Sequence, residues 1–158
     1  MIVATVGTHE SQFDRLMLAL ELLPRDQPLV VQHGSSVPGP AWARSIPFLD
    51  FDEVVEHVRA ADVVISHAGV GSIMVALANE RRPIVVPRLA RYDEVVDDHQ
   101  LWLGRRLDEA GLVVLVEDPA DIAEALPRAQ APPAPLPAGA QGLHEELRAY
   151  LDAHIATA

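Results

Sequence analysis

The sequence predicts an α/β domain built on a doubly wound parallel sheet. Short, continuously apolar segments rich in β-branched residues alternate with amphipathic segments, and Gly, Pro or polar residues separate them. Strands buried on both faces have this unbroken apolar character, and their alternation with helices requires crossovers between parallel strands. The length of 158 residues corresponds to one domain. We therefore expect a Rossmann-like domain whose ligand lies past the carboxyl ends of the strands.

Six segments are expected to form the strands of this sheet. Each is short and mainly apolar, and most of them end at Gly, Pro or a polar residue. They cover residues 2–6, 29–32, 46–49, 62–66, 83–86 and 112–116.

Helices are expected where apolar residues recur with a period of 3.6. Asp50 or Asp52 is a possible N-cap of the second helix, and Pro119 suits the first position of the fifth. Residues 72–79 are apolar nearly all round, which predicts a helix packed deep in the domain. The expected helices cover residues 13–23, 52–60, 72–79, 97–110, 118–126 and 143–155.

The domain itself is expected to occupy residues 1–127. Four prolines among alanines lie within residues 130–139, which indicates a semi-rigid linker over 128–140. Residues 141–158 contain the last expected helix.

Composition excludes several classes of function. The formal net charge of −11 argues against electrostatic binding of nucleic acid or anionic lipid. The absence of Cys excludes disulfides, a thiolate nucleophile and Cys-based metal sites. The N-terminus lacks the pattern of a signal peptide, and no apolar run approaches the roughly 18 residues of a membrane span. We expect a cytoplasmic protein.

The turn after the first strand, residues 7–11, could hold an anion. Gly7 permits a tight backbone path, and the amides that start the next helix have no partner within it. An ordinary βα turn is the alternative interpretation, since Gly7 and Thr8 suit one in any case.

The turn after the fourth strand contains Gly69 and Gly71, which let the backbone approach a ligand closely. The amides of Gly71, Ser72 and Ile73 would then lie at the positive end of a helix dipole, where a diphosphate fits. Close packing of the helix on the strand also selects Gly and is the alternative. The pattern is neither the dinucleotide fingerprint, whose third Gly would fall at Met74, nor a P-loop.

The turn before the fourth helix ends in Asp97, Asp98, His99 and Gln100. Asp97 or Asp98 could cap the helix. His99 and Gln100 lie in the first turn, where side chains can point back over the strand ends, and a carboxylate or amide here could take a ribose hydroxyl. A metal site is disfavoured because neighbouring residues on a helix point in different directions. No metal or cofactor is expected.

The remaining histidines and two phenylalanines have simpler interpretations. Phe48 and Phe51 flank the end of the third expected strand, and their burial tendency favours the core over a ligand contact. The histidines expected at the surface are His33, His57, His144 and His154.

Three of these segments together resemble the C-terminal domain of the family 28 glycosyltransferases. They are HAGVGS at 67–72, PIVVPR at 83–88 and DDHQ at 97–100. That group includes the enzyme that adds N-acetylglucosamine to the lipid precursor of peptidoglycan.

The opening VGTHE at 6–10 with FDRL at 13–16 narrows the resemblance. It is similar to the separate donor-binding subunits of bacterial exopolysaccharide transferases. It is also similar to the soluble subunit of the eukaryotic transferase that adds the second N-acetylglucosamine to dolichol diphosphate. The resemblance covers roughly residues 1–127.

The resemblance implies the C-terminal half of a GT-B glycosyltransferase and a donor-binding function. The expected protein is the UDP-sugar-binding subunit of a two-component inverting glycosyltransferase. It would act on a polyprenyl-diphosphate-linked acceptor in exopolysaccharide or cell-surface glycan synthesis. A complete enzyme of this kind needs about twice this length, so a membrane-associated subunit is expected to bind the lipid-linked acceptor.

Through that partner, the chain would be peripheral at the inner membrane face. The alternatives are a non-catalytic nucleotide-sugar-binding or sensor module, a nicotinamide-dependent enzyme of the same fold class, and a relative with a dead site.

The resemblance also implies roles for individual residues. Gly7 and Thr8 would approach the diphosphate or the acceptor cleft, and the backbone at 49–51 would lie against uracil. His9 is the one local candidate for the general base. The expected donor-binding residues are Gly7, Thr8, Phe51, His67, Ala68, Gly69, Gly71, Ser72, Arg88, Asp97, His99 and Gln100.

One position departs from the family pattern. The single-chain members place a ribose-binding Glu on the helix after the Gly turn. Spacing from the following Pro puts Ala76 there, and Glu80 comes about one helical turn later. Ribose recognition would then fall to residues 97–100.

Overall fold

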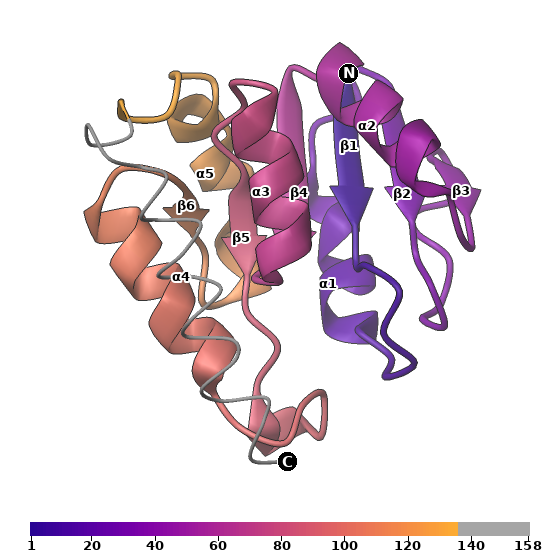
Figure 1. Ribbon diagram of the computed structural model, residues 1–158. Coiled ribbons are helices and arrows are strands. Elements are labelled where there is room, and N and C mark those ends of the chain that lie inside the picture. Colours follow the sequence, from indigo (N-terminus) through magenta and orange to yellow (C-terminus); the bar gives the residue numbers. More distant parts are fainter. Residues whose placement is uncertain (136–158) are drawn as a thin grey trace.

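A computed structural model describes residues 1–135 of the chain as a six-stranded parallel sheet with helices on both faces (Figure 1). The strand order is β3-β2-β1-β4-β5-β6, and every neighbouring pair is parallel. The order reverses between β1 and β4, as in a doubly wound sheet. The predicted fold class is therefore confirmed. The strands are β1 (Ile2–Thr5), β2 (Leu29–Gln32), β3 (Arg44–Ile46), β4 (Val63–His67), β5 (Ile84–Val86) and β6 (Val114–Leu115).

The helices divide between the two faces of the sheet (Figure 1). The first face packs against α1 (Asp14–Ala19), the 3₁₀ helix η1 (Leu20–Leu22) and α5 (Ile122–Ala129). The second packs against α2 (Phe51–Ala60), α3 (Val70–Ala78) and α4 (His99–Glu109). Two further 3₁₀ turns are η2 (Ala90–Tyr92) and η3 (Pro119–Asp121).

The strands are mainly apolar because successive side chains enter two different cores. Ile2 and Ala4 of β1 belong to the cluster with α1 and α5, whereas Val3 packs with Val58 of α2 and Ala76 of α3. Alternate residues of a strand point to opposite faces, so a sheet covered on both sides needs no polar positions.

The third strand was predicted at 46–49, and this is wrong. β3 comprises Arg44–Ile46, and Pro47 follows it directly. Proline has no amide hydrogen to donate to the ladder. Its carbonyl still accepts the amide of Gly34 at 2.8 Å, so the chain stays beside β2 while the strand ends.

Several helix boundaries also differ from the prediction. The expected helix over 13–23 is α-helical only to Ala19 and finishes as the 3₁₀ turn η1. Helix α5 continues through Pro127 to Ala129, so the expected linker at 128–140 begins inside a helix. The helix expected over 141–158 lies outside the described residues.

Helix α2 begins at Phe51 because Asp50, and not Asp52, caps it. The Asp50 carboxylate accepts the Glu53 amide, and the Glu53 carboxylate accepts the Asp50 amide, both at 2.9 Å. This reciprocal pair is a capping box.

Helix α3 is less deeply packed than its all-round apolar character predicts. Ile73 and Ala76 are its buried residues, and Met74, Val75 and Leu77 are only partly buried. Its first turn lies at the carboxyl edge of the sheet, directly after β4.

Candidate functional site

A cavity of about 680 Å³ opens at the carboxyl edge of the sheet between the β1–α1 loop and the start of α3. Strands β1 and β4 are neighbours with Thr5 opposite Ser66, so the segments that follow them meet. The cavity is lined by Gly7, Thr8, His9, Glu10, Ser11, His67, Gly71 and Ser72. The structure thus brings together the predicted residues of the first two turns.

A row of buried polar residues lies beneath the β1–α1 loop. The Thr5 hydroxyl accepts the amide of Gly7 at 3.1 Å and donates to the side-chain oxygen of Gln32. Gly7 has φ = +72°, a conformation that favours glycine. These bonds turn the chain sharply away from β1 and toward the cavity.

Gly7 and Gly69 make room for the ring of His67. A Cβ at Gly7 would lie 2.7 Å from His67 Cε1, and one at Gly69 would lie 2.0 Å from Nε2. The geometry at Gly69 therefore indicates a packing role, and Gly69 is not among the residues that line the cavity. At Gly71 a Cβ would meet nothing within 4 Å, so this glycine is the one that leaves the backbone open to a ligand.

His67 is neutral in this environment. Burial, and to a smaller extent the nearby charge of Arg88, lower the pKa of the imidazole from 6.5 to about 4. A contact with the Thr5 backbone opposes the shift. A neutral ring at the cavity wall can donate a hydrogen bond without adding charge.

The first turn of α3 supplies amide donors to the cavity. Gly69 is the N-cap, and the amide of Ile73 donates to its carbonyl at 3.1 Å. The amides without a partner in the helix are therefore those of Val70, Gly71 and Ser72. The prediction that Ile73 presents its amide is wrong, because the helix begins two residues earlier than expected.

His9 lies at the exposed tip of the β1–α1 loop. Its Nδ1 accepts the amide of Ser11 at 3.1 Å, so in the neutral ring the proton is on Nε2. The free lone pair that a general base needs is occupied in this conformation.

Arg88 and Gln100 are buried and are not among the residues that line the cavity. Arg88 is 1% exposed, and its guanidinium donates to backbone carbonyls of the β1–α1 loop. Gln100 is also buried, and its side-chain oxygen accepts the amide of Arg88 at 3.1 Å. Both were expected to contact the donor, and neither lines the cavity.

Asp97, Asp98 and His99 lie outside the cavity lining. Asp97 accepts the amide of His99 at 3.0 Å and also contacts the His99 ring. Asp98 precedes α4, but its carboxylate accepts the amide of Ala90 at 2.9 Å. Of the two predicted caps, only Asp97 bonds to the start of the helix.

The other expected residues occupy different surroundings. Phe48 and Phe51 are 55% and 69% exposed, so the prediction that they belong to the core is wrong. Ala68 is buried in the core cluster with α4, and Ala76 is fully buried against the sheet. Glu80 follows the end of α3 with φ = +58°. Neither position 76 nor position 80 lines the cavity.

Sequence reasoning placed Glu10 and Ser11 in the first turn but not among the donor-binding residues, and it missed the polar row beneath the loop. Thr5, Gln32 and Ser66 are buried residues that stand opposite one another in β1, β2 and β4. The signal was a polar residue at or near the end of these three strands, which marks the edge where the sheet changes from core to site.

A second cavity of about 430 Å³ adjoins the first at Ser11. It is lined by Ser11, Gln12, Asp14, Arg15, Tyr92, Asp93 and Glu94.

Residues 1–135 contain neither a cluster of metal ligands nor a helix able to span a membrane. No group of three or more His, Cys, Asp or Glu side chains in this part of the chain is arranged to hold a metal ion. None of the helices described there combines the length and apolar character needed to cross a membrane.

Comparison with solved structures supports the fold. The calicheamicin glycosyltransferase CalG4 aligns with a TM-score of 0.60 and 16% identity, over 95% of this chain and 43% of that protein. The glycotransferase of kitacinnamycin aligns with a TM-score of 0.60 and 20% identity, over 94% of this chain and 39% of that protein. The glycosyltransferase SnogD from Streptomyces nogalater aligns with a TM-score of 0.54 and 19% identity, over 94% of this chain and 43% of that protein. At these identities the likeness concerns the fold.

Sequence comparison is more specific. A relative from Sorangium cellulosum (strain So ce56) is 36% identical over 74 residues, which cover 47% of this chain and 17% of the relative. It is named UDP-N-acetylglucosamine--N-acetylmuramyl-(pentapeptide) pyrophosphoryl-undecaprenol N-acetylglucosamine transferase. The family model of the glycosyltransferase family 28 C-terminal domain matches residues 1–145. The chain belongs to the family of glycosyltransferase family 28 C-terminal domains.

Proposed function

We propose that the chain is the UDP-sugar-binding subunit of a two-component inverting glycosyltransferase. Its donor would be a UDP-sugar, and its acceptor a polyprenyl-diphosphate-linked glycan in exopolysaccharide or cell-surface glycan synthesis. The observation that carries the proposal is the cavity at the carboxyl edge, where the first turn of α3 faces the β1–α1 loop.

The cavity has the chemistry of a diphosphate site. Three amides at the start of α3 point along the positive end of the helix dipole, and Gly71 leaves them accessible. In sugar transfer the departing UDP gains negative charge. The fixed backbone amides stabilise this developing charge more than they stabilise the intact UDP-sugar. Neutral His67 provides a further polar group at the wall.

The proposed reaction also needs a base and an acceptor site. The acceptor hydroxyl must lose its proton, and the Nδ1 lone pair of His9 is engaged with Ser11. We therefore assign the base to the partner subunit. His9→Ala should keep most of the transfer activity of the reconstituted complex, and loss of activity would return the base to His9.

The acceptor half is proposed to belong to a membrane-associated partner. The chain spans 17% of the length of the Sorangium relative and about two fifths of the solved glycosyltransferases. The relative is named for a UDP-N-acetylglucosamine donor and an undecaprenol-linked acceptor. A subunit that holds such an acceptor would place this chain at the inner membrane face.

Calorimetric titration of the purified chain tests the donor half of the proposal. UDP and UDP-sugars should bind with and without magnesium, and NAD should not. Gly71→Asp should abolish binding, because its carboxylate repels phosphate while suiting the helix start. Gly71→Asn, of similar size and without charge, should bind UDP more tightly than Gly71→Asp.

Binding of NAD in place of UDP would contradict the proposal. Binding of UDP-sugars without transfer in the presence of the acceptor subunit would instead identify a nucleotide-sugar sensor.

A further inference from the structure

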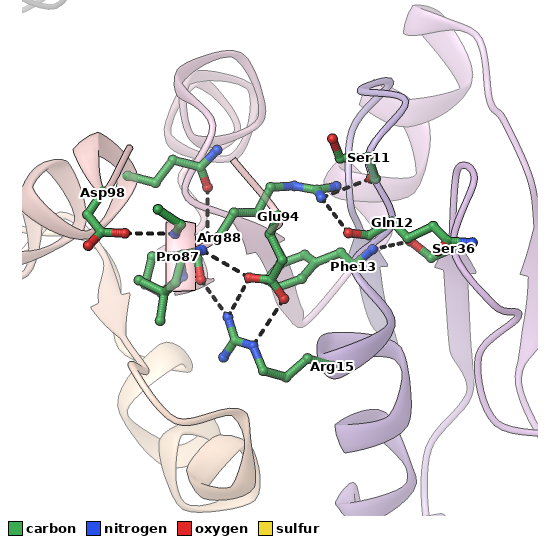
Figure 2. A network of polar contacts seen from close by, with 12 residues as sticks. Ser11, Gln12, Phe13, Arg15, Ser36, Pro87, Arg88, Glu94 and Asp98 are labelled. Carbon is green, nitrogen blue, oxygen red and sulfur yellow. Dashed lines mark hydrogen bonds and ion pairs between the residues drawn. The ribbon is translucent and has the colours of Figure 1, made fainter. Parts of the chain in front are cut away.

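Arg88 joins both ends of the loop that lines the cavity. Its Nη1 donates to the carbonyls of Ser11 at 2.9 Å and Gln12 at 3.0 Å, and its Nη2 lies 3.4 Å from the carbonyl of Val6. Val6 precedes the lining segment 7–11, and Ser11 ends it. Figure 2 shows the guanidinium directed at the far end of this loop.

Further contacts fix the position of Arg88. Its guanidinium stacks on the Phe13 ring at 4.7 Å, and its amide donates to Gln100 at 3.1 Å. The side chain is 1% exposed. One buried residue thus ties the β1–α1 loop to the starts of α1 and α4.

The charge of Arg88 is only partly compensated. The nearby carboxylate is that of Glu94, and its oxygens accept the amide of Leu89 and a forked pair of bonds from Arg15, at 2.9–3.1 Å. Glu94 thus forms its ion pair with Arg15 and acts on Arg88 only electrostatically, from nearby. Inside a protein the charge of Arg88 acts over a longer range than in water, and it reaches the cavity, where it contributes to the lowered pKa of His67.

We propose that Arg88 is a positioning residue for the diphosphate of the donor. It fixes the 7–11 loop as a wall of the cavity and keeps a positive charge behind that wall, without touching the donor. The inference rests on the proposed function, because it names the diphosphate as the group that Arg88 serves.

The test compares UDP with uridine in calorimetric titrations of the full chain. Arg88→Met should weaken UDP binding about tenfold, because it removes a charge that acts on the phosphates. Uridine lacks phosphates, so its dissociation constant should stay within about twofold of wild type. Arg82→Met is the matched control. Arg82 Nε also donates to a backbone carbonyl, that of Val113 at 3.1 Å, but Arg82 precedes β5, at the end of the strand opposite to Arg88. It should change neither constant.

Equal losses for UDP and uridine would overturn the proposal, since they would report a merely structural residue. Unchanged UDP binding would overturn it as well.

If Arg88→Met does not fold, Arg88→Lys tests whether Arg88 positions the 7–11 loop. Lysine keeps the charge but lacks the fork that reaches several carbonyls. Hydrogen exchange of the ligand-free chain should then be faster in residues 7–12 and unchanged in β2. UDP should bind more weakly than to wild type. Unaltered exchange in residues 7–12 together with unaltered UDP affinity would overturn the proposal.

The two proposals fail differently. If wild type binds neither UDP nor a UDP-sugar, the donor function fails, and the diphosphate role of Arg88 fails with it. If wild type binds UDP and the Arg88 variants bind it equally well, only the inference about Arg88 fails.

Discussion

At the scale of single residues, the three glycines near the cavity have three different reasons to be glycine. Gly7 has a positive φ, Gly69 lies against the His67 ring, and Gly71 faces open space. The sequence shows the same residue type in all three places. Gly7 and Gly71 line the cavity, and only at Gly71 would an added Cβ meet no neighbouring atom; sequence pattern alone could not separate these roles.

Alanine at these positions should separate packing from binding. Gly69→Ala should lower the free energy of unfolding by about 1–3 kcal/mol, because its Cβ collides with the His67 ring. Gly71→Ala should keep or slightly raise stability, by up to about 1 kcal/mol, because alanine favours a helix. Urea denaturation of both variants measures this. A larger loss for Gly71→Ala than for Gly69→Ala would contradict the assignment.

His67 should make stability depend on pH. Its pKa falls from 6.5 to about 4 on folding, so between these values the unfolded chain binds the proton more strongly. The contribution of His67 to the free energy of unfolding is complete above about pH 6.5. About 3 kcal/mol of this contribution is lost as the pH falls to about 4.

This pH effect is measured by urea denaturation at pH 7 and pH 4. His67→Gln should reduce the difference between the two free energies of unfolding by about 3 kcal/mol. His57→Gln, on α2, should leave the difference as in wild type. An equal effect of both variants would show that His67 is not the group responsible.

At the scale of elements, α1 and the loop before α4 are joined by one ion pair. Arg15 of α1 reaches Glu94 through a forked pair of bonds and also donates to the carbonyl of Pro87 at 2.9 Å (Figure 2). Its ring contact with Tyr92, at 4.8 Å, lies at the same junction. These contacts hold the two loops that frame the cavities.

Loss of this pair should be costly. Glu94→Ala leaves the Arg15 fork and the Leu89 amide without their acceptor, and it should lower the free energy of unfolding by about 3 kcal/mol. Glu21→Ala removes the carboxylate of an exposed pair with Arg25 and should cost about 0.5 kcal/mol or less. Equilibrium unfolding of the two variants compares them directly. Similar losses would mean that the junction contributes little.

The elements themselves were largely predictable, and the exceptions have local causes. Apolar runs located five of the six strands, whereas β3 (Arg44–Ile46) ends at Pro47 and shares only Ile46 with the run predicted at 46–49. Helix starts were less certain, because α3 begins with Val70, Gly71 and Ser72, which carry no capping signal. By contrast, the Asp50–Glu53 capping box is visible in the sequence as an acidic pair three residues apart.

At the scale of the whole molecule, topology explains why part of the site could be predicted. In a parallel sheet the loops after β1 and β4 meet at one edge, which brings Gly7 to Gly71 without any knowledge of side chains. The direction of individual side chains is set by packing. Arg88 and Gln100 follow the same edge, yet they turn inward and bind the backbone.

The central claim is that this cavity receives the diphosphate of UDP. The most direct measurement is a titration of the isotope-labelled full chain with UDP, followed by the amide chemical shifts. The account predicts saturable shifts at Val70, Gly71 and Ser72 and along residues 7–11, with smaller shifts at the same amides when uridine replaces UDP. The absence of shifts at saturating UDP, or shifts confined to the second cavity around Arg15 and Tyr92, would contradict it.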